Sequence, residues 1–126
     1  MRSSLSPVAA AIGALLLAGC GASLDQVRAE PVRLTVPTPV AYDTMANCLA
    51  ARSSQVYAVT PLVFPREGKA TVTLAAKTTD SIQAEYSVRR AGDGSVVEWR
   101  RRQLVGNDIG GMQADAQETI ERCSKV

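Results

Sequence analysis

The middle of the chain alternates between apolar and polar residues, which is the pattern of strands with one buried face. Residues 69–77 and 81–90 alternate cleanly, and residues 55–64 are rich in valine, tyrosine and phenylalanine. Pro61 indicates an edge position or a bulge for the run 55–64. Turn-forming residues separate the runs at 65–68 and 78–80. The pattern predicts consecutive antiparallel strands that share one apolar face.

The segment Ala91-Gly92-Asp93-Gly94 predicts a hairpin that leads into a fourth strand. Two registers are compatible with it. A two-residue loop pairs Val88 with Trp99, whereas a four-residue loop pairs Val88 with Val97 and Tyr86 with Trp99. The registers differ by a slip of two residues, so both place Trp99 on the apolar face. We therefore expect Trp99 in the core.

Two segments with helical spacing flank these strands. Asp43 or Thr44 can cap a helix that runs to about residue 52 or 53, and Asn107 or Asp108 can cap a second one near the C-terminus. Each helix has one mainly apolar face. The first face comprises Met45, Cys48, Leu49 and Arg52, and the second comprises Met112, Ala116, Ile120 and Cys123.

The predicted fold class is α+β. We expect a two-layer sandwich in which a four-stranded antiparallel meander carries an N-terminal and a C-terminal helix on one face, in the order α-β-β-β-β-α. Residues 32–36 also alternate, so they can add an edge strand that ends at Pro37. The expected organisation is a signal segment over 1–19, a lipidated N-terminus and proline-rich tether over 20–41, and one domain over 42–126.

The N-terminus has the features of an export signal. Arg2 supplies a positive charge, an apolar run of about 11 residues follows over 8–18, and the run ends in Leu17-Ala18-Gly19-Cys20. This tetrapeptide resembles the lipobox of bacterial lipoproteins. The resemblance implies that Cys20 carries a diacylglycerol on its sulfur and becomes the first residue of the mature chain.

The same resemblance implies a location. Gly21 rather than aspartate follows the cysteine, which in enteric-type sorting implies the outer membrane, on its periplasmic side. Because one acyl chain binds a membrane only marginally, the two or three chains of this family would make the anchor long-lived. The implied partner is therefore the membrane, through the lipid anchor.

Cys48 and Cys123 are the two cysteines that remain besides Cys20. An exported protein meets an oxidising compartment, where an even pair usually forms a disulfide. With two candidates the connectivity follows, and both residues lie on the apolar faces of their helices. A reactive thiol or a metal pair has no support, since no histidine or third free cysteine accompanies them.

Composition argues against several classes of function. The formal net charge is +2, which gives no reason to expect nucleic acid as a partner. The chain has no histidine, the commonest general base and metal ligand. The loop carboxylates Asp80, Asp93 and Asp108 are accounted for by turn or cap chemistry. We expect no catalytic residues, no metal and no cofactor.

The arginine triplet at 100–102 is the one local concentration of charge in the sequence. Arg100 and Arg102 face away from Trp99 in a strand, and with Arg89 they form a candidate binding face on the open side of the sheet. Such a face could receive lipid phosphates, lipopolysaccharide or an acidic protein. The alternative is a solvated face, with Glu98 opposite Arg89 and Glu85 near Arg102 as ion pairs.

These observations predict a lipid-anchored, non-enzymatic binding or accessory protein of the cell envelope. Its partner, presumed to be an envelope protein or another envelope component, and its oligomeric state are left open. The alternative is a periplasmic inhibitor of a secreted enzyme such as host lysozyme. Such an inhibitor needs an exposed loop, for which the turns at 65–68 and 91–94 are the candidates.

Overall fold

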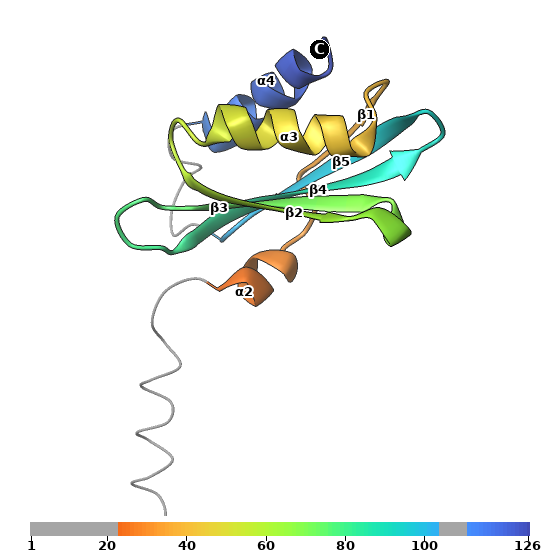
Figure 1. The fold of residues 1–126 in the computed structure, drawn as a ribbon. Helices are drawn as coiled ribbons and strands as arrows, with labels where there is room; N and C mark the ends of the chain where they lie inside the picture. Colours follow the sequence, from red (N-terminus) through yellow and green to blue (C-terminus); the bar gives the residue numbers. More distant parts are fainter. Residues whose placement is uncertain (1–22, 104–110) are drawn as a thin grey trace, which may run out of the picture.

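The computed structural model describes residues 23–103 and 111–126, which form an antiparallel sheet with helices on both faces (Figure 1). The sheet has five strands in the order β1-β5-β4-β3-β2. The α+β class and the meander from β2 to β5 are as predicted. The strands are β1 (Leu34–Thr38), β2 (Ala58–Phe64), β3 (Lys69–Ala75), β4 (Ile82–Ala91) and β5 (Gly94–Arg101), and a short 3-10 turn, η1 (Pro65–Glu67), joins β2 to β3.

The hairpin between β4 and β5 selects one of the two registers that the sequence left open. Tyr86 lies opposite Trp99 and Val88 opposite Val97. This register was predicted with a four-residue loop, and that loop length is wrong: Ala91 pairs with Gly94, so Gly92 and Asp93 alone form the loop, and Gly92 has a φ of 60°. A positive φ at the first loop residue belongs to a type II′ turn, whose twist matches that of the flanking strands.

The edge strand that the sequence allowed at 32–36 is present, displaced to Leu34–Thr38, and pairs with β5. Pro37 does not end it. The edge position explains this, because a proline there need not donate a ladder hydrogen bond. The end of β1 also explains why residue 94 is a glycine, because a Cβ added there would overlap the carbonyl oxygen of Thr38.

Two helices, α3 (Tyr42–Ser53) and α4 (Met112–Cys123), cover one face of the sheet as predicted (Figure 1). Trp99 is 1% exposed in the layer between them and the sheet, so its predicted place in the core is confirmed. The predicted caps of α3 are wrong. Ala41 is the N-cap and makes no side-chain hydrogen bond, while the Asp43 carboxylate accepts only from the neighbouring Thr44 amide.

Most residues of the two predicted apolar helix faces are buried or half-buried, with one exception. On α4, Ala116, Ile120 and Cys123 are buried, and Met112 is half-buried. Arg52 of α3 is exposed instead of sharing the buried face. The predicted caps Asn107 and Asp108 lie outside the described residues, and α4 begins later than predicted, with Gly111 as its N-cap and no side-chain hydrogen bond there.

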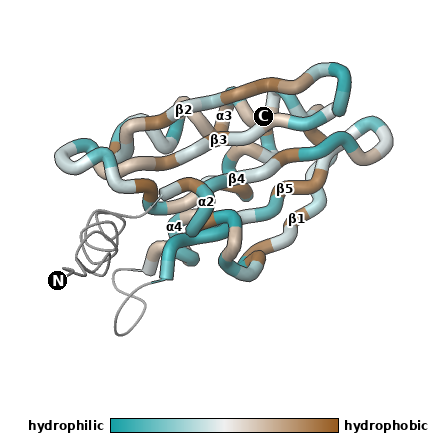
Figure 2. Tube along the Cα trace, turned by 90° about the horizontal axis from the view of Figure 1, so that it is seen from below, coloured by the Kyte–Doolittle hydropathy of each residue, from teal (hydrophilic) through white to brown (hydrophobic). Residues whose placement is uncertain are grey.

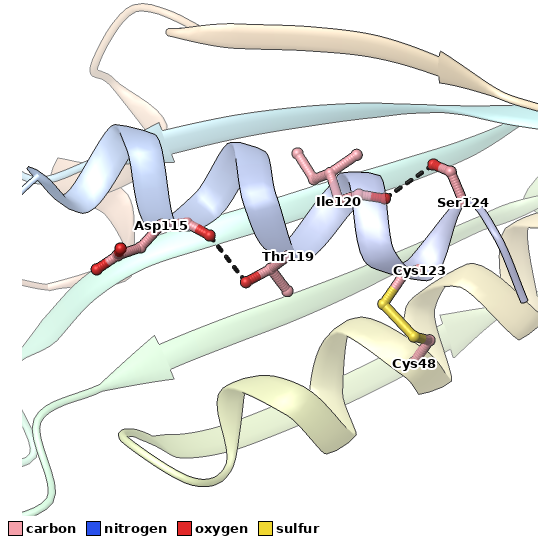
Figure 3. The surroundings of a disulfide bond; sticks show 6 residues. All are labelled: Cys48, Asp115, Thr119, Ile120, Cys123 and Ser124. Carbon is pink, nitrogen blue, oxygen red and sulfur yellow. Dashed lines mark hydrogen bonds between the residues drawn. A yellow bond between two sulfur atoms is a disulfide. The ribbon is translucent and has the colours of Figure 1, made fainter.

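A disulfide joins Cys48 of α3 to Cys123 of α4, as expected (Figure 3). Their Cα atoms are 5.7 Å apart, and 75 positions separate them in the sequence. Because the two helices are at opposite ends of the domain sequence, the bond ties both ends of the fold together over the same sheet face.

The segment expected to be a tether contains a helix that the sequence pattern did not predict, α2 (Leu24–Arg28). It packs against β4 and β5 on the face opposite α3 and α4 (Figures 1 and 2). Val27 is fully buried there. We call the two sides of the sheet the α3/α4 face and the α2 face.

Candidate functional site

The predicted binding residues lie on the α2 face, but they do not form one free basic stripe. Strand alternation puts Arg89, Arg100 and Arg102 on the side opposite Trp99. Arg100 donates from Nε to the carbonyl oxygen of Glu30 at 3.1 Å, so it holds the segment that follows α2. The Nε of Arg102 is buried and has no hydrogen-bond partner within the described part of the chain. Arg89 is the most accessible of the three.

A buried carboxylate fixes α2 to this face. Glu85 is 4% exposed, and both of its oxygens accept from Arg28: Nη2 to Oε2 at 2.8 Å and Nε to Oε1 at 3.1 Å. Thr73 also donates to Oε2, at 3.4 Å. The hydrogen bond to Glu85 raises the pKa of Arg28 above its ordinary value, although burial acts in the opposite direction. A bidentate pair of this kind supplies orientation as well as energy.

The two ion pairs expected on this face have different outcomes. Arg89 does pair with Glu98, with 3.8 Å between Nε and Oε1, but from a neighbouring register position, because Glu98 lies opposite Ser87. The Arg89 side chain is 55% exposed, so the pair contributes little to stability. Glu85 lies opposite Arg100, not Arg102, and its partner is Arg28.

The part of the α2 face nearest the turns has a different composition. Register places Phe64, Lys69, Arg89 and Val96 in one row across four strands, and Leu62 lies two residues before Phe64 on the same face. Leu62 and Phe64 are 48% and 38% exposed, so two large apolar side chains of one strand face solvent on the same side of the sheet. We call these five residues the cationic patch.

A hollow of about 280 Å³ opens on the other side of the sheet, between the C-terminal part of α3 and the N-terminal part of α4. Its wall contains the Tyr86 hydroxyl, and Ser53 and Thr119 hydrogen-bond to that group. Burial raises the pKa of Tyr86 to about 12, and those hydrogen bonds oppose the shift. Tyr86 is therefore neutral at physiological pH and acts as a hydrogen-bonding group.

Tyr57 in the same wall behaves similarly: burial and the nearby Asp115 carboxylate raise its pKa. The hollow thus combines neutral hydroxyls with an apolar floor from Leu74 and Trp99. The same walls carry the carboxylates of Asp115 and Glu118 beside the Thr119 hydroxyl, which donates to the Asp115 carbonyl oxygen at 2.8 Å. The arrangement suits packing and hydrogen bonding.

Within 23–103 and 111–126, no cluster of three or more histidine, cysteine or acidic side chains could hold a metal ion. Over the same ranges, no helix has the length and apolar character needed to cross a membrane. Cys20, the predicted lipidation site, lies outside them.

Sequence reasoning missed the Arg28–Glu85 contact, although a local signal for α2 was present. Ser23 and Gln26 form a capping box: the Ser23 hydroxyl accepts from the Gln26 amide, and the Gln26 side chain accepts from the Ser23 amide. The Ser-x-x-Gln spacing before Val27 is the sequence signature of this motif. The signature predicts a helix start but says nothing about the carboxylate that the helix meets.

Comparison with known proteins adds no relative: no protein-family model, curated protein or solved structure matches the chain.

Proposed function

We propose that this protein is a lipid-anchored binding protein of the bacterial cell envelope and that it is not an enzyme. The observation that carries the proposal is the tetrapeptide Leu17-Ala18-Gly19-Cys20 directly after a short apolar run. In this proposal Cys20 is acylated, and the domain is displayed on the periplasmic side of the outer membrane.

The Cys48–Cys123 disulfide supports an exported location. Such bonds persist in oxidising compartments and are rare in the reducing cytosol. This one closes a long loop between two helices on the same sheet face, so it stabilises the whole domain. It therefore has a structural role that requires no thiol chemistry.

The two sides of the sheet support binding as the activity. The α3/α4 face is largely covered by its two helices, although Val63 of β2 is 44% exposed on that side. The α2 face displays exposed apolar and cationic side chains together in the cationic patch. Contiguous exposed apolar side chains with a charged border are typical of interaction sites. The proposed binding face is thus the cationic patch. Of the three arginines predicted from the sequence as a binding face, this patch contains Arg89.

The anchor is tested with Cys20→Ser and a matched variant, Ser23→Ala, three residues further on. The Cys20→Ser protein should leave the membrane fraction or keep its signal segment. Mass spectrometry of the wild-type and Ser23→Ala proteins should show the mass of the acyl chains on a chain that begins at Cys20. Normal processing and membrane retention of Cys20→Ser would contradict the proposal.

The binding role is tested by cross-linking in the intact envelope, followed by identification of the adducts. Lys69→Gln with Arg89→Gln should reduce capture of the partner, whereas Arg52→Gln with Lys125→Gln on the opposite side should leave it unchanged. Equal capture by both double variants would exclude the cationic patch as the binding face.

A second candidate function is inhibition of a secreted enzyme such as host lysozyme, and one observation favours it. The two candidate turns lie together at the same end of the sheet, because Arg90 donates its amide to the carbonyl of Gly68 at 2.8 Å. The Arg90 guanidinium also lies over the Tyr42 ring, 5.2 Å from its centroid. A lysozyme activity assay with wild type and with Arg66→Ala tests this: inhibition lost in the variant would support it.

A further inference from the structure

We propose that the cationic patch lies against the anionic phospholipid surface of the same membrane that holds the lipid anchor. The inference rests on the proposed function, since it needs Cys20 to be acylated, and it adds an orientation and a second membrane contact. The occupant is a surface of phosphate headgroups, recognised by Lys69 and Arg89, with Leu62 and Phe64 inserted among the acyl chains.

The first argument is the length of chain between the anchor and the fold. Ser23 caps α2, and Cys20 is three residues before it. Three residues span at most roughly 10–11 Å even when fully extended. Because Arg28 and Glu85 hold α2 on the sheet, the anchor lies close to the α2 face. That face must then be near the membrane and turned toward it.

The second argument is the apolar composition of β2. No charged residue occurs from 53 to 65, although β2 is an edge strand. Exposed edges are usually protected from association by charged side chains or by proline, and β2 has Pro61 but no charge. Leu62 and Phe64 point to the α2 face and are about half and two-fifths exposed. Figure 2, which views this face, shows the apolar stretch of β2 along one border of the sheet.

The third argument is the placement of charge. Lys69 lies directly opposite Arg89 on the same face, and like charges in that position repel each other. Phosphate groups between them would relieve the repulsion. Glu98 pairs with Arg89 at 3.8 Å on this face and offsets part of the charge, while the acidic side chains Asp115, Glu118 and Glu121 of α4 lie on the other side of the sheet. The charges that would meet an anionic surface are therefore Lys69 and the Arg89 side chain, which is 55% exposed.

Adjacent residues of β2 provide a matched test. Phe64 faces the α2 side and Val63 the α3/α4 side, with 38% and 44% exposure. The photoreactive residue p-benzoylphenylalanine is placed in each position of the full chain. Each acylated protein is reconstituted into vesicles of phosphatidylethanolamine and phosphatidylglycerol, irradiated and examined by mass spectrometry for phospholipid adducts. We expect several-fold more adduct from position 64 than from position 63.

The charge requirement is tested on the same vesicles. Lys69→Gln with Arg89→Gln should lower the adduct yield at position 64, by about fivefold per lost charge if each contributes as a juxtamembrane cation does. Arg52→Gln with Lys125→Gln should not lower it. High salt should act like the first pair, because it screens exposed charges.

The outcomes separate this inference from the function on which it rests. Acyl chains on Cys20 together with equal adducts at 63 and 64 would overturn the orientation and leave the anchor intact. Adducts at 64 that join two protein chains, or that join another protein in intact cells, would overturn it in favour of a protein partner. Absence of acyl chains on Cys20 would overturn the anchor itself.

Discussion

The two faces of the sheet are stabilised by different forces. On the α3/α4 face, large apolar side chains such as Trp99, Met45, Leu49 and Ile120 are at most 1% exposed, and a disulfide joins the two helices above them. On the α2 face, a five-residue helix is held by one buried valine, one bidentate ion pair and one hydrogen bond to Arg100. One face depends on apolar burial and a covalent bond, and the other largely on charge.

This difference separates stability from function. Apolar burial contributes about 25 cal/mol for each Å² removed from water and is not weakened by charge screening, so the α3/α4 face accounts for most of the stability. Charge contacts at a half-exposed surface are weaker and depend on ionic strength. The α2 face can therefore change its contacts with a partner while the core stays folded. The predictions below test this division.

The disulfide should have the largest effect. Cys48→Ala with Cys123→Ala should lower the free energy of unfolding by about 4.5 kcal/mol, as expected for a closed loop of 75 residues. Urea denaturation followed by circular dichroism measures the loss. Reduction of the wild-type protein is the control and should give a similar value. A loss below about 1 kcal/mol would show that the bond is not what holds the two helices over the sheet.

Trp99→Ala should cost about 3–5 kcal/mol, the range for truncation of a buried tryptophan in a core. Trp99→Phe leaves a smaller cavity and should cost less. Wild-type tryptophan fluorescence should be blue-shifted in the native state and shift to the red on unfolding. Emission typical of a water-exposed indole in the native protein would mean that the face assigned to the core is solvated.

Glu85→Gln should have a smaller and more local effect. It weakens a hydrogen-bonded ion pair whose cation is half exposed and can be solvated, so we expect a loss of about 1–2 kcal/mol. Hydrogen exchange should show loss of protection in α2 while β4 stays protected. Glu98→Gln is the matched control, because its pair with Arg89 is longer and exposed, and it should stay within about 0.5 kcal/mol. Global unfolding of the Glu85→Gln protein would contradict the inference that the α2 face can lose its contacts while the core stays folded.

Tyr86 should affect stability only at high pH. Its folded pKa of about 12 lies above the ordinary phenol value of 10, so the folded protein retains a proton that the unfolded chain loses. Stability from this group is full below about pH 10 and falls as the pH rises toward 12. Tyr86→Phe should reduce that alkaline slope. Spectrophotometric titration should show Tyr86 ionising late, and titration of Tyr86 near pH 10 would contradict its burial.

Much of the α3/α4 face could be predicted from local patterns. The period of two placed Trp99 and Tyr86 on one side of the sheet in either hairpin register, and the periods of three and four placed Cys48 and Cys123 on helices. Two cysteines allow one pairing. These inferences succeed because apolar burial depends on which face a residue occupies, and alternation determines the face.

Little of the α2 face could be predicted in the same way. Arg100 was expected to be free for a partner, yet it holds the carbonyl of Glu30, and Arg28 meets Glu85 across 57 positions of sequence. The choice between hairpin registers belongs here too, since it decides whether Glu85 lies opposite Arg100 or Arg102. Such contacts join distant segments, and no local period encodes them.

The sequence by itself determined the class of fold, the buried side of the strands that carry Tyr86 and Trp99, and the cysteine pairing. The tertiary structure alone decided that residues 24–28 form a helix on the second face, that Lys69 lies opposite Arg89, and that Phe64 continues their row. The physical reason is the separation along the sequence between the residues that interact. Burial follows from periodicity within one element, whereas charge contacts depend on which elements the folded chain brings within a few ångströms of each other.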